Sequence, residues 1–333
     1  MTAPVAGVST PQLKGSPEIA LTGATGFIGT TLITHLTSAG WRVRALYRPR
    51  SGRVPPNLPG VEWFAGDLSD AAALNTLVTG THAVIHCAGA VRGASRADFD
   101  QVNEDGALRV SQAAARQVHT PRFLLISSLA ARMPELSHYA GSKWRGESAI
   151  KATAENLRWT VLRPPAVYGP GDRELLPLFR SIANGFAPLP AGANGRFSMI
   201  YVEDLAVAVV RWLAEDTGYG QTFELDDGRE GGYNWDAVLE IGGRVLRGGA
   251  SVRRVPIPIP LLNLAAYTNL AAARMLGYAP MLTPGKVREI THEDWLCDNR
   301  EFTKVTGWQP AFGLEQGLAC IFNKNIATLQ EIL

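Results

Sequence analysis

Short apolar runs alternate with segments of helical periodicity through the first half of this 333-residue chain. Glu18–Thr22 is one such run. It is too short for a helix and is followed by glycine, which is typical of a buried strand. Apolar residues then recur at helical spacing in 27–39, and Gly40 ends that pattern. The alternation predicts right-handed βαβ units that build a parallel sheet with helices on both faces.

The same two patterns predict the other elements. We expect strands at 18–22, 42–47, 60–65, 83–87, 123–127 and 159–163, and helices at 27–39, 70–78, 99–118 and 139–154. Beyond Pro164 the pattern loosens, because Pro and Gly cluster as far as Gly195. A strand at 198–202 followed by a helix at 204–214 then predicts a return to the main sheet. In such a sheet, ligands bind at the carboxyl ends of the strands.

Composition narrows the functional classes. Hydrophobic residues make up 46% of the chain and charged residues 19%, so a substantial core can form. Lys and Arg number 32 against 30 Asp and Glu, and this net charge of +2 argues against an electrostatically driven nucleic-acid binder. Cys87, Cys297 and Cys320 show no paired spacing and the six His are dispersed. We therefore expect no disulfide, no metal site and a cytoplasmic location.

Two segments bear on targeting and on membranes. Residues 1–16 contain no apolar h-region, so we expect a flexible tail rather than a signal peptide. Residues 255–273 carry no charge and are flanked by Arg254 and Arg274, but three prolines disfavour a helix in their first third. We expect an apolar helix at 260–276 packed in a substrate-binding region. The alternative is an interfacial helix beside a site for a lipid-like substrate.

A glycine-rich turn joins the first predicted strand to the first helix. It reads Thr22-Gly23-Ala24-Thr25-Gly26-Phe27-Ile28-Gly29. Gly23 permits a tight turn, Gly26 lets the backbone approach a pyrophosphate at the helix N-terminus, and Gly29 lets the helix pack closely. The turn therefore predicts a dinucleotide site in a Rossmann domain.

This turn resembles the cofactor turn of the extended short-chain dehydrogenases/reductases, also called the NAD-dependent epimerase/dehydratase family. Four further segments are similar to elements of that family: 66–68 to the adenine contact, 86–89 to the end of the fourth strand, 163–170 to the segment beside the nicotinamide, and 307–310 to a C-terminal element. The cofactor contacts that the resemblance implies are Gly23, Thr25, Gly26, Phe27, Ile28, Gly29, Asp67, Leu68, Cys87, Ala88, Gly89, Pro165 and Val167, together with the catalytic pair described below.

The resemblance covers nearly the whole chain in order. It implies an α/β fold in which 17–165 and 198–226 form a doubly wound Rossmann domain that binds the cofactor. A smaller, mostly C-terminal substrate-binding region then comprises 166–197 and 227–333.

The segment after the second predicted strand bears on the choice of cofactor. An acidic residue there would bind the ribose 2′-hydroxyl of NAD, but 41–53 contains no Asp or Glu. It contains Arg42, Arg44, Arg48, Arg50 and Arg53. Arg48, at the end of the strand, is placed to grip a 2′-phosphate, with Arg50 or Arg53 as helpers. We expect NADP, with NAD as the alternative.

A Tyr and a Lys four residues apart provide the candidate catalytic pair. Tyr139 and Lys143 lie on one face of the predicted helix, where Lys143 would lower the phenol pKa from about 10 and reach the nicotinamide ribose. In the resembling family the triad Ser or Thr aligns with Ser128, which would hold the reacting oxygen, while Ser127 is a partner or a turn residue. Asn103 resembles the Asn of helix four, which implies a structural role and a part in a proton relay.

These residues predict NAD(P)-dependent hydride transfer that interconverts a secondary alcohol and a ketone on a small molecule. Dehydratases of the family resemble one another in an acidic pair directly after the triad Ser or Thr. In this chain Leu129-Ala130 follow Ser128 instead, which argues against water elimination. Because the acidic residue after the second strand is missing, a nucleotide-sugar epimerase is only the first alternative. The second is a cofactor-binding redox sensor or assembly protein without turnover, against which the intact Ser, Tyr and Lys argue.

The C-terminal third bears on the substrate and on assembly. With its proline-rich run and the turn expected at 283–286, it resembles the dihydroflavonol-reductase and 3β-hydroxysteroid-dehydrogenase-like branch. That branch acts on hydrophobic ketones or alcohols, so we expect a hydrophobic substrate. Relatives often pair through two long helices, here 99–118 and 139–154, which would give a homodimer.

Overall fold

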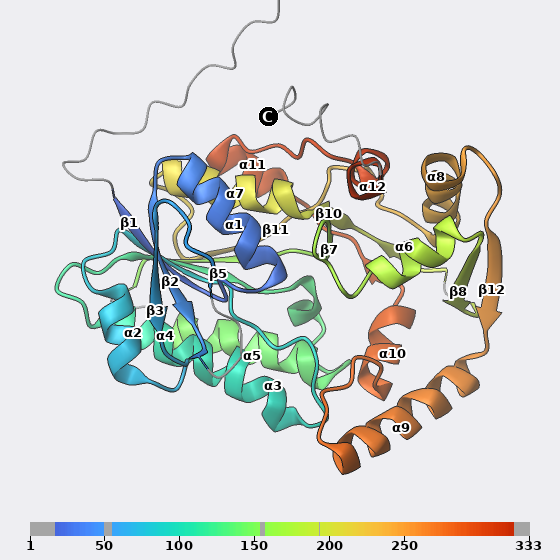
Figure 1. Cartoon of the computed structure of the whole chain (residues 1–333), viewed down its shortest axis with the longest axis horizontal. Coiled ribbons are helices and arrows are strands. Elements are labelled where there is room, and N and C mark those ends of the chain that lie inside the picture. Colours follow the sequence, from blue (N-terminus) through green and yellow to red (C-terminus); the bar gives the residue numbers. More distant parts are fainter. Residues whose placement is uncertain (1–16, 50–54, 154–156, 193, 323–333) are drawn as a thin grey trace, which may run out of the picture.

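A parallel sheet forms the centre of the molecule. The computed structural model describes residues 17–49, 55–153, 157–192 and 194–322, and in this part of the chain seven strands make up the sheet. They are β1 (Glu18–Thr22), β2 (Arg42–Tyr47), β3 (Val61–Ala65), β4 (Ala83–His86), β5 (Arg122–Ile126), β6 (Trp159–Arg163) and β11 (Gln221–Glu224). Their order is β3-β2-β1-β4-β5-β6-β11 (Figure 1). The order reverses at β1 and β4, which confirms the doubly wound Rossmann fold.

Helices cover both faces of this sheet (Figure 1). One face carries α1 (Phe27–Ser38), α7 (Val202–Ala214) and α11 (Arg300–Thr306), and the other carries α2 (Ala71–Val78), α4 (Asp105–Ala115) and α5 (His138–Ala152). Every residue of β4 and β5 is buried, because helices cover both faces of these central strands.

The smaller region lies beyond the carboxyl ends of the strands (Figure 1). Its elements are β7 (Ala166–Tyr168), α6 (Leu176–Ala183), β8 (Phe186–Pro190), β9 (Arg196–Phe197), β10 (Met199–Tyr201), α8 (Trp235–Arg247), β12 (Arg253–Ile257), α9 (Ile259–Leu276), α10 (Pro284–Thr291), β13 (Asp294–Trp295) and α12 (Leu314–Phe322). Its strands form the parallel pairs β7–β10, β8–β12 and β9–β13. A separate apolar cluster that includes Tyr168, Phe179 and Tyr233 forms its core.

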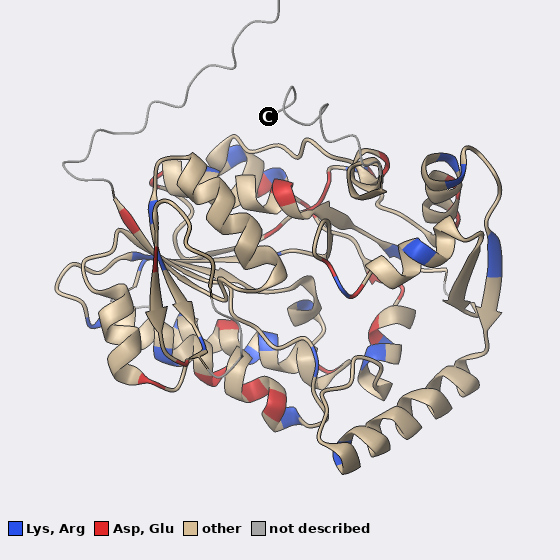
Figure 2. Ribbon diagram, in the orientation of Figure 1, with Lys and Arg blue, Asp and Glu red and all other residues tan. Residues whose placement is uncertain are grey.

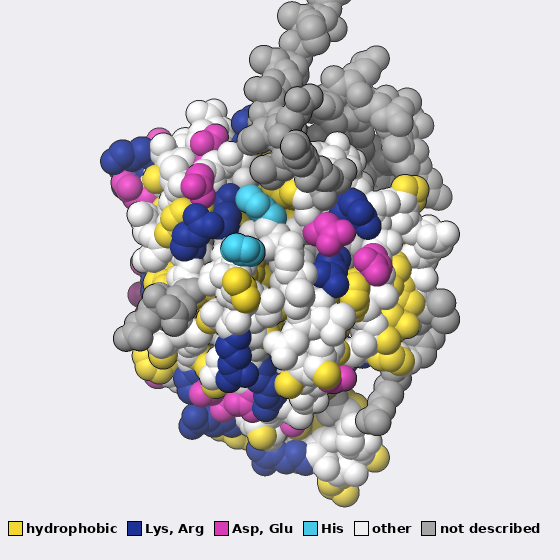
Figure 3. All heavy atoms as spheres, turned by 90° about the vertical axis from the view of Figure 1, so that its left-hand side faces the viewer, with side chains coloured by type: hydrophobic (Ala, Val, Ile, Leu, Met, Phe, Trp, Pro, Cys, Tyr) yellow, Lys and Arg dark blue, Asp and Glu magenta, His cyan; other side chains and the backbone are white. Residues whose placement is uncertain are grey.

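Charged side chains are spread over both parts of the molecule (Figure 2). On the face seen in Figure 3, Lys and Arg lie next to Asp and Glu. The basic residues therefore form no continuous patch on that face, in keeping with the nearly balanced composition.

The expectation of a single helix at 99–118 is wrong. The structure has α3 (Arg96–Asn103) and then α4, with Glu104 between them at a local distortion of the backbone (φ −99°, ψ −66°). The break lies where α5 crosses most closely, because a Cβ on Gly146 would overlap the carbonyl oxygen of Asn103. Tertiary packing, which local periodicity does not record, therefore divides the helix.

Two further expectations need correction. The strand expected at 198–202 does not join the main sheet: β10 pairs with β7, and the chain returns to the main sheet only at β11. The reason is that β7 leaves the sheet directly after β6 and offers β10 a partner there. The turn expected at 283–286 is the start of α10, where the Thr283 side chain accepts the backbone N–H of Lys286 and Pro284 is the first helical residue.

The helix expected at 260–276 is present as α9, but most of it is not packed. Only Ala266 and Ala273 of its residues are buried. In the described part of the chain, no helix is both long enough and apolar enough to cross a bilayer. The expectation of a packed helix is therefore wrong for most of its side chains, since apolar composition alone does not show whether other elements cover a helix.

The α5 crossing leads to a stability prediction. We expect Gly146→Ala to lower the free energy of unfolding by about 1–3 kcal/mol, because the added methyl group must displace the backbone at Asn103. The gain in helix propensity offsets only part of this cost. Denaturant unfolding measures the difference, and Ser148→Ala, two residues further along α5, serves as the control. Equal stability of the two variants would contradict the crossing.

Candidate active site

The glycine-rich turn lies between β1 and α1, where the strand order reverses. Gly23 has φ +73°, and a Cβ there would lie 2.5 Å from the backbone nitrogen of Ala88. A Cβ on Gly29 would overlap the carbonyl oxygen of Gly23, so the first turn of α1 packs directly on the glycine turn. Both glycines are therefore required by close backbone contacts.

The N-terminus of α1 provides the anion-binding end of this turn. Gly26 is the N-cap residue, and within this described helix there is neither a side-chain cap nor an acidic residue in the first turn. Thr25 is exposed, and Phe27 and Ile28 are half-buried beside it. Uncapped amide groups at a helix N-terminus favour a phosphate, so these residues fit the pyrophosphate of a dinucleotide.

The segment after β4 continues the same edge. The backbone N–H of Cys87 donates to the carbonyl oxygen of Thr22 (3.2 Å), and that of Ala88 donates to the Thr22 hydroxyl (3.4 Å). A Cβ on Gly89 would lie 3.6 Å from the Lys143 Nζ. This segment therefore lies between the glycine turn and α5. Burial raises the pKa of the Cys87 thiol to about 12, against a lowering by Lys143, so the thiol is neutral and no nucleophile.

The ends of β2 and β3 hold the residues predicted to contact the adenosine. Arg48 is exposed directly after β2. Asp67 is exposed after β3, and its carboxylate accepts hydrogen bonds from the backbone and the hydroxyl of Ser69, both at 3.0 Å. Leu68 packs against α4 at Gly106. Arg48 and Asp67 thus follow adjacent strands at the edge that carries the glycine turn.

Two other arginines of the basic segment, Arg42 and Arg44, lie within β2 rather than after it. Arg44 donates to the carbonyl oxygens of Thr79 and Thr76 at the end of α2 (2.6 and 2.7 Å), and Arg42 pairs with Glu18. These two side chains serve the fold rather than the cofactor edge. Arg50 and Arg53 lie outside the described residues.

Ser128, Tyr139 and Lys143 come together at the end of β5. Ser128 follows β5, and its hydroxyl accepts the backbone N–H of Ala130 (3.2 Å). Tyr139 lies in the first turn of α5, where the neighbouring Ser128 hydroxyl favours the ionised form of the phenol. Lys143 lies one turn further, buried, and its Nζ donates to the carbonyl oxygen of Ile126 (2.9 Å). The structure therefore places the three predicted catalytic residues in one site.

The electrostatics of the site differ from the expected arrangement. Burial raises the pKa of Tyr139, while the Ser128 hydroxyl and the charge of Lys286 lower it in part, and the net shift is upward. Burial lowers the pKa of Lys143 to about 8. The expected lowering of the phenol pKa by Lys143 is therefore wrong for this structure, where the cation acting on the phenol is Lys286. The phenol is protonated at neutral pH and can donate a proton.

Asn103 and Ser127 have structural roles. The Asn103 side chain accepts the backbone N–H of Ala90 (2.8 Å) and donates to the Ala90 carbonyl (2.9 Å) and the Ser142 hydroxyl (2.8 Å), which confirms its predicted structural role. The Ser127 hydroxyl donates to the buried carboxylate of Glu147 (2.5 Å), so it faces α5. The remaining predicted residues are both half-buried: Pro165 lies between β6 and β7, and Val167 lies within β7.

Comparison with known proteins places this site in a family. Residues 19–225 match the model of the NAD dependent epimerase/dehydratase family. The chain belongs to this family. It is 36% identical over 299 residues to a ceramide reductase of Caulobacter vibrioides, covering 90% of this chain and 91% of the relative. It is 25% identical to a decarboxylating sterol-4-alpha-carboxylate 3-dehydrogenase of Saccharomyces cerevisiae, covering 94% and 98%.

The fold of this epimerase/dehydratase family member also matches solved structures. That of MoeE5 in complex with UDP-glucuronic acid and NAD superposes with a TM-score of 0.70 at 20% identity, covering 96% of this chain and 100% of the other. Family and relatives together identify the chain as an NAD-dependent enzyme of the oxidoreductase/epimerase type.

The smaller region adds residues to the site that the sequence did not indicate. The Lys286 Nζ lies 5.8 Å from the centre of the Tyr139 ring and donates to Glu289 (2.7 Å). Glu289 in turn accepts the hydroxyl of Ser137, the N-cap of α5, and a Cβ on Gly285 would lie 2.8 Å from the Ser137 Cβ. A Thr-Pro helix start at 283–284 was the available signal for α10, but no local pattern shows that α10 meets α5.

The pKa values of this family member's site predict a pH profile. Lys143 loses its charge as the pH rises through about 8, whereas the raised pKa of Tyr139 keeps the phenol protonated there. We expect kcat/KM, with the cofactor as the varied substrate, to fall above that pH by about tenfold per unit. In Lys143→Arg this decline should vanish, because a guanidinium stays protonated. A profile that is the same in both proteins would contradict the assignment.

Proposed function

We propose that the chain interconverts a ketone and a secondary alcohol on a hydrophobic substrate, with NADP as the preferred cofactor. The observation that carries the proposal is the position of Tyr139 beside Ser128, with Lys143 one turn along α5, at the strand edge of the glycine turn. A protonated phenol beside a hydroxyl is suited to hold a carbonyl oxygen and to give it a proton.

The residues then take distinct roles. The nicotinamide, when bound, supplies or accepts the hydride. Tyr139 donates its proton to the substrate oxygen during reduction and accepts one during oxidation. Ser128 orients the same oxygen through its hydroxyl. Lys143 keeps a positive charge at the loop after β4, and its bond to Ile126 fixes its position.

Two observations support NADP. Arg48 is exposed at the end of β2, and the described residues of 41–49 contain no carboxylate that would repel a 2′-phosphate. Arg42 and Arg44 lie at the start and in the middle of β2, whereas Arg48 follows its carboxyl end, where the cofactor edge lies. NAD remains the alternative, since NAD is the cofactor in the complex of MoeE5.

The relatives support a hydrophobic substrate. One is a ceramide reductase and another a sterol-4-alpha-carboxylate 3-dehydrogenase, and both names describe oxidation or reduction of a lipid. An epimerase would instead hold NAD tightly through purification and consume no NADPH with ketones. A cofactor-binding sensor would bind NADPH tightly and show no turnover with any ketone of a panel.

Tyr139→Phe tests the proton donor. We expect kcat for ketone reduction to fall by about 10²–10⁴-fold, because the ring remains and only the proton is lost. NADPH fluorescence titration should give an unchanged Kd. Tyr219→Phe is the matched control, since that hydroxyl bonds to Asp216 away from the site and its loss should leave kcat unchanged. Full activity of Tyr139→Phe would refute the assignment.

Arg48→Ala tests the cofactor preference. Loss of a charge-assisted contact of about 1.5–3 kcal/mol should raise the KM for NADPH by about 10–150-fold and leave that for NADH unchanged. Arg42→Ala removes an exposed arginine of the same strand and should change neither value. An equal effect of Arg48→Ala on both cofactors would show that Arg48 does not read the 2′-phosphate.

A further inference from the structure

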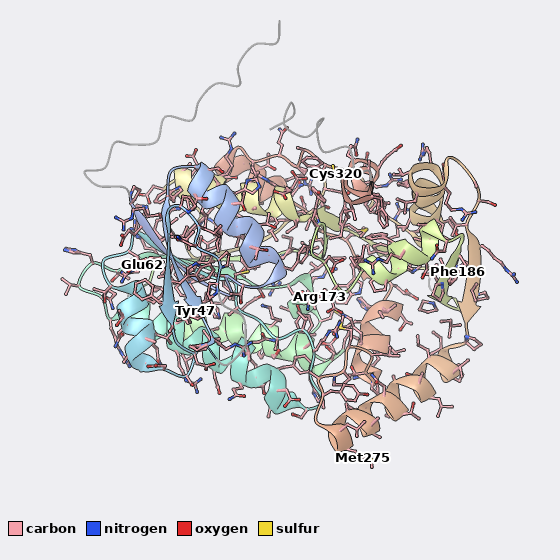
Figure 4. All side chains as sticks on the ribbon, viewed as in Figure 1. Tyr47, Glu62, Arg173, Phe186, Met275 and Cys320 are labelled. Carbon is pink, nitrogen blue, oxygen red and sulfur yellow. The ribbon has the colours of Figure 1, made fainter. Side chains whose placement is uncertain are left out.

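The outer face of α9 is unusual for a surface helix. Its exposed large side chains are Leu261, Leu264, Tyr267, Met275 and Leu276, of which Met275 is 85% exposed. The residues between them on that face are Ala265, Thr268 and Ala271, so the face carries no charge from Leu261 to Ala271, and Arg274 is its one charged residue. Figure 2 shows α9 uncharged apart from its end, and Figure 4 shows Met275 directed away from the molecule. A helix in contact only with water normally has a charged outer face.

The chain segment that carries α9 is rich in basic residues, some of which pair with carboxylates outside it. From residue 241 to residue 288 the chain contains no Asp or Glu, whereas seven residues are basic. These are Arg244, Arg247, Arg253, Arg254, Arg274, Lys286 and Arg288. Arg253 precedes α9 on β12 and Arg274 lies in its last turn, so positive charge stands at both ends of the apolar face, whereas the neighbouring Arg254 pairs with Asp236.

We propose that this outer face of α9 docks on the surface of a lipid bilayer that contains anionic lipid. Amphipathic helices that lie in the interface bury an apolar face at the level of the headgroups, and flanking basic side chains bind anionic lipid. Tyr267, 60% exposed on the flank of the face, fits the headgroup region. A nucleic acid would use the charges but not the apolar side chains, so the combination selects a bilayer.

This surface is connected to the catalytic residues. α9 is followed by α10, and the Asn269 side chain of α9 donates to the Leu282 carbonyl just before α10 (2.8 Å). α10 holds Lys286 at 5.8 Å from the Tyr139 ring. A docked enzyme would therefore have the bilayer next to the element that faces its proton donor. Docking itself goes beyond the proposed function and does not depend on it.

Vesicle flotation tests the docking. The full chain is mixed, without substrate, with vesicles of phosphatidylcholine and phosphatidylglycerol or of phosphatidylcholine alone. We expect binding to the anionic vesicles and a loss of the partition coefficient by about tenfold or more in Leu264→Glu/Met275→Glu, because both side chains leave the interface. Val118→Glu, in the loop between α4 and β5 at a residue that is 96% exposed, should bind as the unaltered protein does.

A second variant tests the contribution of the basic side chains, and its thermal unfolding shows whether it is still folded. Arg253→Gln/Arg274→Gln should weaken binding to anionic vesicles by about tenfold and leave the thermal unfolding midpoint unchanged. The proposal is overturned if the unaltered chain does not float with anionic vesicles, or if Leu264→Glu/Met275→Glu floats as well as Val118→Glu. It is also overturned if gel filtration shows that the α9 variant changes a dimer into a monomer, since the face would then bind a second copy.

Activity assays separate this proposal from the proposed function. A water-soluble ketone should be reduced equally by the unaltered chain and by the α9 variant, while reduction of a ketone held in vesicles should fall with binding. Flotation without any ketone reduction would leave docking supported and the proposed function refuted. Ketone reduction without flotation would refute docking and leave the proposed function supported.

Discussion

The site depends on a close approach of backbone to backbone at the ends of β1 and β4. The missing Cβ atoms of Gly23 and Gly29 bring the glycine turn against Ala88 on one side and against the start of α1 on the other. The uncapped amides of α1, the segment 87–89 and the Nζ of Lys143 are thereby collected at one edge of the sheet. A side chain at either glycine would separate the groups suited to a pyrophosphate from those suited to a carbonyl.

Much of this arrangement is predictable from the sequence because it rests on local spacing. A glycine turn between a strand and a helix, and a Tyr and Lys one turn apart, are properties of short segments. The break after Asn103 depends instead on the crossing of α5 at Gly146, and the partner of β10 is β7, far from it in the chain. Tertiary contacts decide both, so periodicity alone could not show them.

The same limit explains what sequence reasoning missed at the site. The bond between Ser137 and Glu289 joins residues 152 positions apart, and the place of Lys286 beside Tyr139 follows from it. The expected effect of Lys143 on the phenol pKa assumed that one turn of helix brings the ammonium to the hydroxyl. Lys143 instead bonds to the Ile126 carbonyl and is buried. The positive charge that lowers the pKa of the phenol in part is that of Lys286.

The Ser137 hydroxyl has two hydrogen-bond partners, one in its own helix and one in α10. It accepts the backbone N–H of Ala140 as the cap of α5, and it bonds to Glu289 of α10. The first turn of α5 carries Tyr139, only two residues after that cap. α10 therefore contacts the cap of the helix that carries the proton donor, and the Arg288 side chain adds a bond to the Leu136 carbonyl beside it (2.7 Å). The smaller region thus helps to fix the N-terminus of α5, so the position of the phenol depends on residues from both parts of the molecule.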